Sequence, residues 1–244
     1  MEVGGRFVAT SVEGFIQQLV SYITRGYRYY VAGEIPTRKC AEEVDLKLIK
    51  RYGIDAKKWT RARRKAQGLA NLRYLRHDQF FVILATEGRH SFLFEERNVI
   101  RDIRETPVTI AGYSVSLRPG GRRRDGTPDP KLRAHVRIGT ARYRELKSYF
   151  VELARHRRAD ALAAELWRVP FEPYAPVRRQ LLNVLRAVNE VRKKAGFERL
   201  PYSVLRYKRR IVKPFERPES RVYASTPGAS TSSAFDQSPD SGRA

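Results

Sequence analysis

The sequence predicts an α+β fold, in which an antiparallel central sheet joins an N-terminal helix-turn-helix-like region and a C-terminal helical part. Three observations support this prediction. In the first half of the chain, segments with helical periodicity alternate with short segments rich in aromatic and β-branched residues. Two strand-like segments are separated only by residues 77–79, which favours antiparallel pairing. Most of residues 140–195 carries the 3.6-residue period of amphipathic helices.

The first half of the chain is predicted to contain three helices and three strands. Ser11 can cap the first helix, and a glycine follows each of the three. The third helix is expected to turn Trp59, Ala62 and Ala66 inward. Residues 80–85 are apolar throughout, which predicts a strand buried on both faces. In chain order the expected elements are helix 12–25, strand 27–35, helix 41–52, helix 56–67, strand 71–76 and strand 80–86.

The second half is predicted to complete the sheet and then become helical. Val99, Ile100 and Ile103 indicate a short helix within residues 88–105. Strands are expected at 108–117 and 132–138, paired across a basic loop and sharing one central sheet with the hairpin at 71–86. Helices are expected at 140–156, 160–167 and 177–195, followed by an extended basic segment at 200–215.

Composition divides the chain into three regions. Residues 1–105 form the helix-turn-helix and hairpin region, and residues 106–216 are expected to pack on the same core. Residues 217–244 are rich in Ser, Thr, Pro, Gly and Ala, which predicts a disordered tail. A hydrophobic content of 41% is sufficient for a buried core in the rest of the chain.

The sequence also bears on the compartment. The single cysteine, Cys40, excludes an internal disulfide framework and fits a reducing environment. The longest apolar run, Phe80–Ala85, is too short to cross a bilayer. The first ten residues lack the basic and apolar regions of a signal peptide. We therefore expect a cytoplasmic protein, associated with the nucleoid if it binds DNA.

The charge of the chain is strongly asymmetric. It contains 49 Lys and Arg against 26 Asp and Glu, which gives a formal charge of +23. Residues 217–244 are neutral, so the excess lies in residues 1–216. Residues 56–76 contain no acidic residue, whereas a solvated surface normally mixes both signs. This indicates a polyanionic partner: nucleic acid first, then an anionic membrane surface or an acidic protein. The bases of this segment are Lys57, Lys58, Arg61, Arg63, Arg64, Lys65, Arg73 and Arg76.

The element order over residues 11–86 resembles that of the winged helix-turn-helix domains, which bind DNA through their third helix and often a hairpin wing. The resemblance covers about a third of the chain and rests on element order and charge, not on a sequence motif. It implies that helix 56–67 is the recognition helix, with Trp59 and Ala62 packed behind it. An ordinary wing alternates polar and apolar residues, whereas 80–85 does not. The alternative is a single α+β domain with a basic helix on one face. Under the resemblance, Lys57, Lys58, Arg61, Arg64 and Lys65 face the groove, and Arg73 and Arg76 flank the hairpin tip.

Two further basic patches are candidates for phosphate contact. One is a loop triplet beside two glycines, and the other alternates basic residues with Tyr202 and Tyr207, as suits stacking on single strands. Alternatively, the loop is merely solvated and the tyrosines face the core. The bases concerned are Arg122, Arg123, Arg124, Arg206, Lys208, Arg209 and Arg210.

Motifs for catalysis are mostly absent from the sequence. It has no Walker A loop, no GxSxG, no HExxH, no His-X-His and no pair of cysteines. Only Glu87 and His90, which follow an apolar strand, form a candidate constellation. With Glu34 or Asp45 they could hold Mg²⁺ or Mn²⁺ for phosphodiester cleavage. The simpler interpretation pairs Glu87 with an arginine and leaves His90 in a loop, with no enzyme activity and no cofactor.

The sequence thus predicts a nucleic-acid-binding protein, with DNA favoured over RNA and duplex DNA as the first candidate. A role in replication, recombination or transcription control, in a bacterial or mobile-element setting, is the expected context. A metal-dependent nuclease of a mobile element and an RNA-binding or assembly protein are the alternatives.

Overall fold

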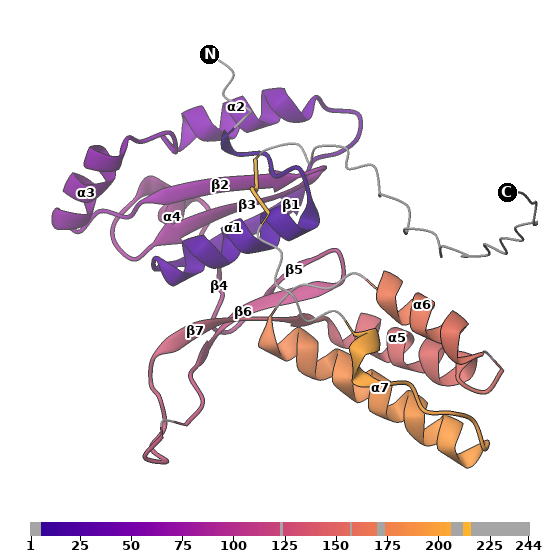
Figure 1. Cartoon of the computed structure of the whole chain (residues 1–244). Helices are drawn as coiled ribbons and strands as arrows, with labels where there is room; N and C mark the ends of the chain where they lie inside the picture. Colours follow the sequence, from indigo (N-terminus) through magenta and orange to yellow (C-terminus); the bar gives the residue numbers. More distant parts are fainter. Residues whose placement is uncertain (1–5, 123, 157, 170–173, 206–211, 216–244) are drawn as a thin grey trace, which may run out of the picture.

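The computed structural model describes residues 6–122, 124–156, 158–169, 174–205 and 212–215. The α+β prediction is confirmed: an N-terminal helix is followed by antiparallel strands, and the later helices form the C-terminal part (Figure 1). The predicted tail at 217–244 lies outside the described residues.

The described helices and strands follow the expected order closely in the first half of the chain and continue into the C-terminal part. They are α1 (Val12–Thr24), β1 (Tyr27–Glu34), α2 (Ala41–Arg51), α3 (Lys58–Ala66), β2 (Leu72–His77), β3 (Phe80–Thr86), α4 (Ser91–Glu95), β4 (Arg101–Asp102), β5 (Val108–Ile110), β6 (Tyr113–Pro119), β7 (Leu132–Ile138), α5 (Thr140–Leu153), α6 (Ala159–Arg168), α7 (Ala175–Lys194) and the short 3₁₀ helix η2 (Tyr202–Val204).

The first sheet has the strand order β2-β3-β1-β4 and is covered on both faces (Figure 1). Val82 and Leu84 of β3 join the hydrophobic cluster that contains the buried face of α1. The alternate residues, Ile83 and Ala85, join a second cluster that contains the inner side of α2. Strand β3 is therefore buried on both faces, as its continuous apolar run predicts.

The second sheet has the order β5-β6-β7 and carries the C-terminal helices (Figure 1). Val115 and Val136 of this sheet belong to the same cluster as the α1 residues. Leu181 and Val184 of α7 join them, so this core connects residues from both halves of the chain. The two strands predicted at 108–117 and 132–138 were expected to share one sheet with the β2–β3 hairpin, and this was wrong: the described strands form two separate sheets.

Local signals explain the ends of several elements. The Ser11 hydroxyl accepts a hydrogen bond from the Gly14 amide at 3.1 Å, which caps α1 as predicted. The expected single strand at 108–117 is instead a hairpin, β5–β6. Its two turn residues, Ala111 and Gly112, both have positive φ, which matches the twist of a two-residue hairpin turn.

The expected helix around Val99 and Ile103 is also absent from the described structure. The helix of this region lies earlier, at α4, where His90 provides the cap. Ile103 is instead in an irregular segment directly after β4. Its amide donates to the Arg28 carbonyl beside the first sheet, and its side chain is buried in the same cluster as the α1 residues. Within the described residues, no helix is long and apolar enough to cross a membrane.

Candidate nucleic-acid interface

Helix α3 carries most of the basic segment and lies at an extremity of the molecule (Figure 1). It is attached to the body through backbone carbonyls. The Arg61 guanidinium donates to the Ala56 carbonyl, and the Asn71 amide donates to the Arg61 carbonyl at 3.0 Å. Arg64 reaches the Gly53 carbonyl at 3.5 Å. The two arginines therefore lie on the side of α3 that faces the body.

The opposite side of α3 is turned to solvent. Trp59 is 82% exposed, and Ala62 and Ala66 are exposed as well. These three residues were expected to pack inward, and this was wrong. Arg61 and Arg64 are instead the half-buried residues of α3, and their guanidinium groups reach the backbone carbonyls of Ala56 and Gly53.

Positive charge surrounds the exposed side of α3 without a negative partner. Lys57, Lys58, Arg63 and Lys65 are exposed. Among the described residues, none of these four, and neither arginine of the inner side, forms an ion pair with a carboxylate. Because no acidic residue occurs between residues 56 and 76, the helix surface has no neutralising group of its own.

A second basic group lies where α3 meets the sheet. The Arg73 guanidinium is 5.2 Å from the centre of the Tyr22 ring, and its Nε is buried without a hydrogen-bond partner among the described residues. The pKa of Arg61 is lowered, first by burial and then by the charge of Arg73. Two half-buried guanidinium groups thus repel each other here, and an anion such as phosphate would relieve the repulsion.

Arg76, predicted as a nucleic-acid contact, lies in a different environment, which favours a structural role. Its side chain is 6% exposed, and its Nε lies 2.9 Å from Oδ2 of Asp45. Its other nitrogens donate to Glu42 and to the Asp78 carbonyl, while the Tyr74 hydroxyl donates to Asp45. Arg76 therefore connects α2 to β2 beneath the surface.

The loop predicted as a phosphate contact extends from the β6–β7 hairpin, away from α3 (Figure 1). Arg122 and Arg124 are exposed in it. The loop also contains Asp125 and Asp129, and Asp129 pairs with Arg133 at 2.9 Å, so its charge is partly balanced. The other predicted bases, Arg123, Arg206, Lys208, Arg209 and Arg210, lie outside the described residues.

The residues of the possible metal site are not brought together. Glu34 pairs with Phe80 at one end of β3, so it lies on the order of 20 Å from Glu87 at the other end. His90 caps α4, where its Nδ1 accepts the Phe92 amide at 3.1 Å. The pKa of His90 is lowered, mainly by burial and then by Arg64, so the ring is neutral at pH 7. Glu87 is 75% exposed and lies 4.0 Å from Arg28.

Asp45, the other possible ligand, is held by Arg76 and Tyr74 as described above. Within the described residues, no group of three or more His, Cys, Asp or Glu is arranged to hold a metal ion.

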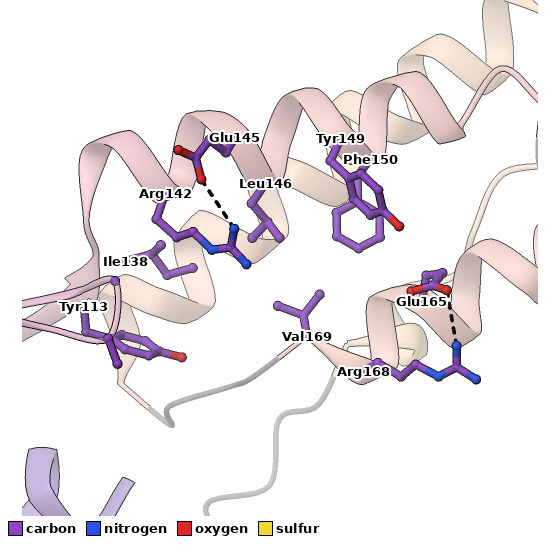
Figure 2. A pocket seen from close by; sticks show the side chains of 12 residues that line it. Tyr113, Ile138, Arg142, Glu145, Leu146, Tyr149, Phe150, Glu165, Arg168 and Val169 are labelled. Atoms are coloured by element: carbon purple, nitrogen blue, oxygen red, sulfur yellow. Dashed lines mark hydrogen bonds and ion pairs between the residues drawn. The ribbon is translucent and has the colours of Figure 1, made fainter. Parts of the chain in front are cut away.

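A cavity of about 540 Å³ lies elsewhere, between the β5–β6 turn, α5 and the end of α6. Figure 2 shows its two arginines beside acidic neighbours: Arg142 is 3.4 Å from Glu145, and Arg168 is 3.2 Å from Glu165. The rest of its lining is mainly apolar and aromatic, including Tyr113, Leu146, Tyr149 and Phe150. Its charges are therefore matched, and it contains none of the predicted phosphate-binding residues.

The chain matches no protein-family model and no curated protein. The geometry of α3 and its surroundings is consequently the basis for assigning a function.

Proposed function

We propose that the protein binds nucleic acid through α3, with DNA as the first candidate. The observation that supports this proposal is a helix with exposed Lys58, Arg63 and Lys65 and no carboxylate partner among the described residues. Phosphates would neutralise these charges and release counterions. The Arg61–Arg73 corner offers a further position for a phosphate. A winged helix-turn-helix mode, with α3 as the recognition helix, and a role in replication, recombination or transcription control are part of this proposal.

Fluorescence anisotropy with labelled DNA, titrated across salt, tests the proposal. The double variant Lys58→Glu and Arg63→Glu should bind at least about tenfold more weakly at low salt and show a salt slope smaller by about 2, since two phosphate contacts are lost. The matched control is Arg144→Glu with Lys147→Glu, which makes the same change of charge on exposed positions of α5. Equal losses for both variants would mean that net charge acts without a defined site.

The choice of positions follows from the structure. Arg61 and Arg64 hold α3 to the body, so reversing their charge would disturb the helix as well as the interface. Lys58 and Arg63 make no such contact with the part of the chain that the structure describes, and their loss therefore reports on the interface itself. Metal-dependent shortening of the labelled DNA in the same samples would instead support the nuclease alternative.

A further inference from the structure

The exposed side of α3 has the composition of a stacking platform. Trp59, Ala62 and Ala66 follow the spacing i, i+3 and i+7, so they lie along one face of the helix. Trp59 is 82% exposed, although large aromatic side chains normally bury about 150–250 Å² each. Ala62 and Ala66 are small and exposed, so neither residue puts a large side chain beside the indole. Residues of this face contribute nothing to either hydrophobic core.

The charges around this face indicate which kind of partner covers it. Arg63 lies one turn after Trp59 on the same side, and Lys58 and Lys65 lie together on one flank of this face. An apolar protein surface or a second copy of this basic chain would bring these cations into an unfavourable contact. A nucleic-acid strand provides both complementary features, phosphates for the cations and an aromatic base for the indole.

The exposed indole also distinguishes between paired and unpaired bases. Within a duplex, both faces of each base are covered by its neighbours, so an indole can reach a face only where the stack is opened. A single strand presents its bases freely, and stacking on aromatic side chains contributes strongly to its binding.

We propose that α3 binds single-stranded nucleic acid, with Trp59 stacked on an unpaired base and Arg63 and Lys58 contacting the flanking phosphates. This inference rests on the proposed function, that α3 binds nucleic acid, and specifies an unpaired strand as the substrate in place of the duplex groove that a winged helix-turn-helix mode would use. Its failure can be separated from failure of the proposed function, because binding and stacking are measured by different signals.

The chain provides a direct probe, since it contains only two tryptophans, Trp59 and Trp167. In the full-length variant Trp167→Phe, all tryptophan emission comes from Trp59. Without ligand, this emission should resemble that of a fully hydrated indole. Oligothymidylate should quench it strongly, whereas a blunt duplex of the same length should quench it weakly. The matched control, Trp59→Phe, retains Trp167 and should show little quenching with either ligand.

Affinity provides the second readout. Trp59→Ala should weaken binding of oligothymidylate about 5- to 150-fold, the range for loss of one stacked base, while its effect on the duplex stays below about threefold. Trp59→Tyr should recover much of the affinity, because a phenol ring also stacks. Circular dichroism of each variant checks that the helices are retained.

Three outcomes would overturn the proposal. Binding of oligothymidylate by anisotropy, with neither quenching of Trp59 nor an effect of Trp59→Ala, would leave nucleic-acid binding intact and remove the stacking. A blue-shifted emission of Trp59 in the free protein would show that a second copy or another part of the chain covers this face. If neither single-stranded nor duplex DNA or RNA binds at low salt, the proposed function fails together with this inference.

Discussion

Replacing Arg76 tests whether this arginine stabilises the fold without contributing to nucleic-acid binding. In Arg76→Met, the free energy of unfolding should fall by about 3–5 kcal/mol, the cost of leaving one partner of a buried ion pair without the other. The affinity of the folded protein for nucleic acid should stay within about twofold of the wild type, because the Arg76 side chain is 6% exposed and lies beneath the surface.

The magnitude follows from what the substitution leaves behind. Arg76 Nε lies 3.0 and 2.9 Å from the two oxygens of Asp45, whose side chain is 5% exposed. After the change, Asp45 keeps the hydroxyl of Tyr74 as its one hydrogen-bond donor among the described side chains, and the Asp78 carbonyl loses a donor at 2.7 Å. The loss is a large part of the 5–15 kcal/mol that stabilises a typical domain.

Lower pH should reduce this loss. Burial already raises the pKa of Asp45, and removal of the arginine raises it further. A carboxyl group whose pKa is higher in the folded than in the unfolded state adds stability at low pH and loses it as the pH rises. The deficit of Arg76→Met should therefore be smaller at pH 5 than at pH 7.5.

Urea unfolding followed by circular dichroism measures these differences. Glu42→Ala is the matched control, because it removes the exposed partner of Arg76 and should change stability little. The double variant Asp45→Leu and Arg76→Met should be more stable than Arg76→Met alone, since no unpaired charge remains. Unchanged stability combined with weaker binding would refute this reasoning and return Arg76 to the interface.

Three further predictions concern other parts of the chain. His90→Asn should keep the cap of α4 but reduce the fall in the free energy of unfolding between pH 7.5 and 5. Because the pKa of His90 is lowered in the folded state, its contribution to stability is present at neutral pH and lost on acidification. Urea unfolding at several pH values measures this, and the same pH dependence in variant and wild type would contradict it. Gly88→Ala should lower the melting temperature and cost at least about 1–3 kcal/mol, since Gly88 has φ +128° and a Cβ there would lie 2.7 Å from the Ala70 amide nitrogen. Deletion of residues 219–244 should leave anisotropy titrations unchanged, because the deleted residues carry little net charge, and a large loss of affinity would show that they take part in binding.

The sequence predicts the order of elements better than the orientation of α3. The double-sided burial of β3 can be read from its apolar run, because six consecutive apolar residues leave no polar face. The orientation of α3 could not be predicted in this way. Its apolar stripe contains one tryptophan and two alanines, and two arginines on the other side satisfy their charges on backbone carbonyls. Periodicity alone does not distinguish these two faces.

The buried ion pair of Asp45 and Arg76 could have been predicted from the hydrophobic periodicity of α2 and β2. Asp45 shares the inner stripe of α2 with Ala41 and Ile49, at spacing i and i+4. Arg76 shares one face of β2 with Tyr74, which is fully buried. A carboxylate and a guanidinium that both occupy inward positions indicate a buried ion pair. The corner of Tyr22 and Arg73 has no comparable signal, because it depends on how α1 crosses the sheet.

The double-sided burial of β3 makes the whole chain sensitive to the length of this strand. Val82 and Leu84 supply one core while Ile83 and Ala85 supply the other. Insertion of a single residue before Val82 would exchange these two sets, since successive side chains point to opposite faces. The cluster that joins α1 to the C-terminal helices and the cluster beneath α2 would then both be packed wrongly. We therefore expect evolution of this protein to tolerate insertions in its loops but not in this strand.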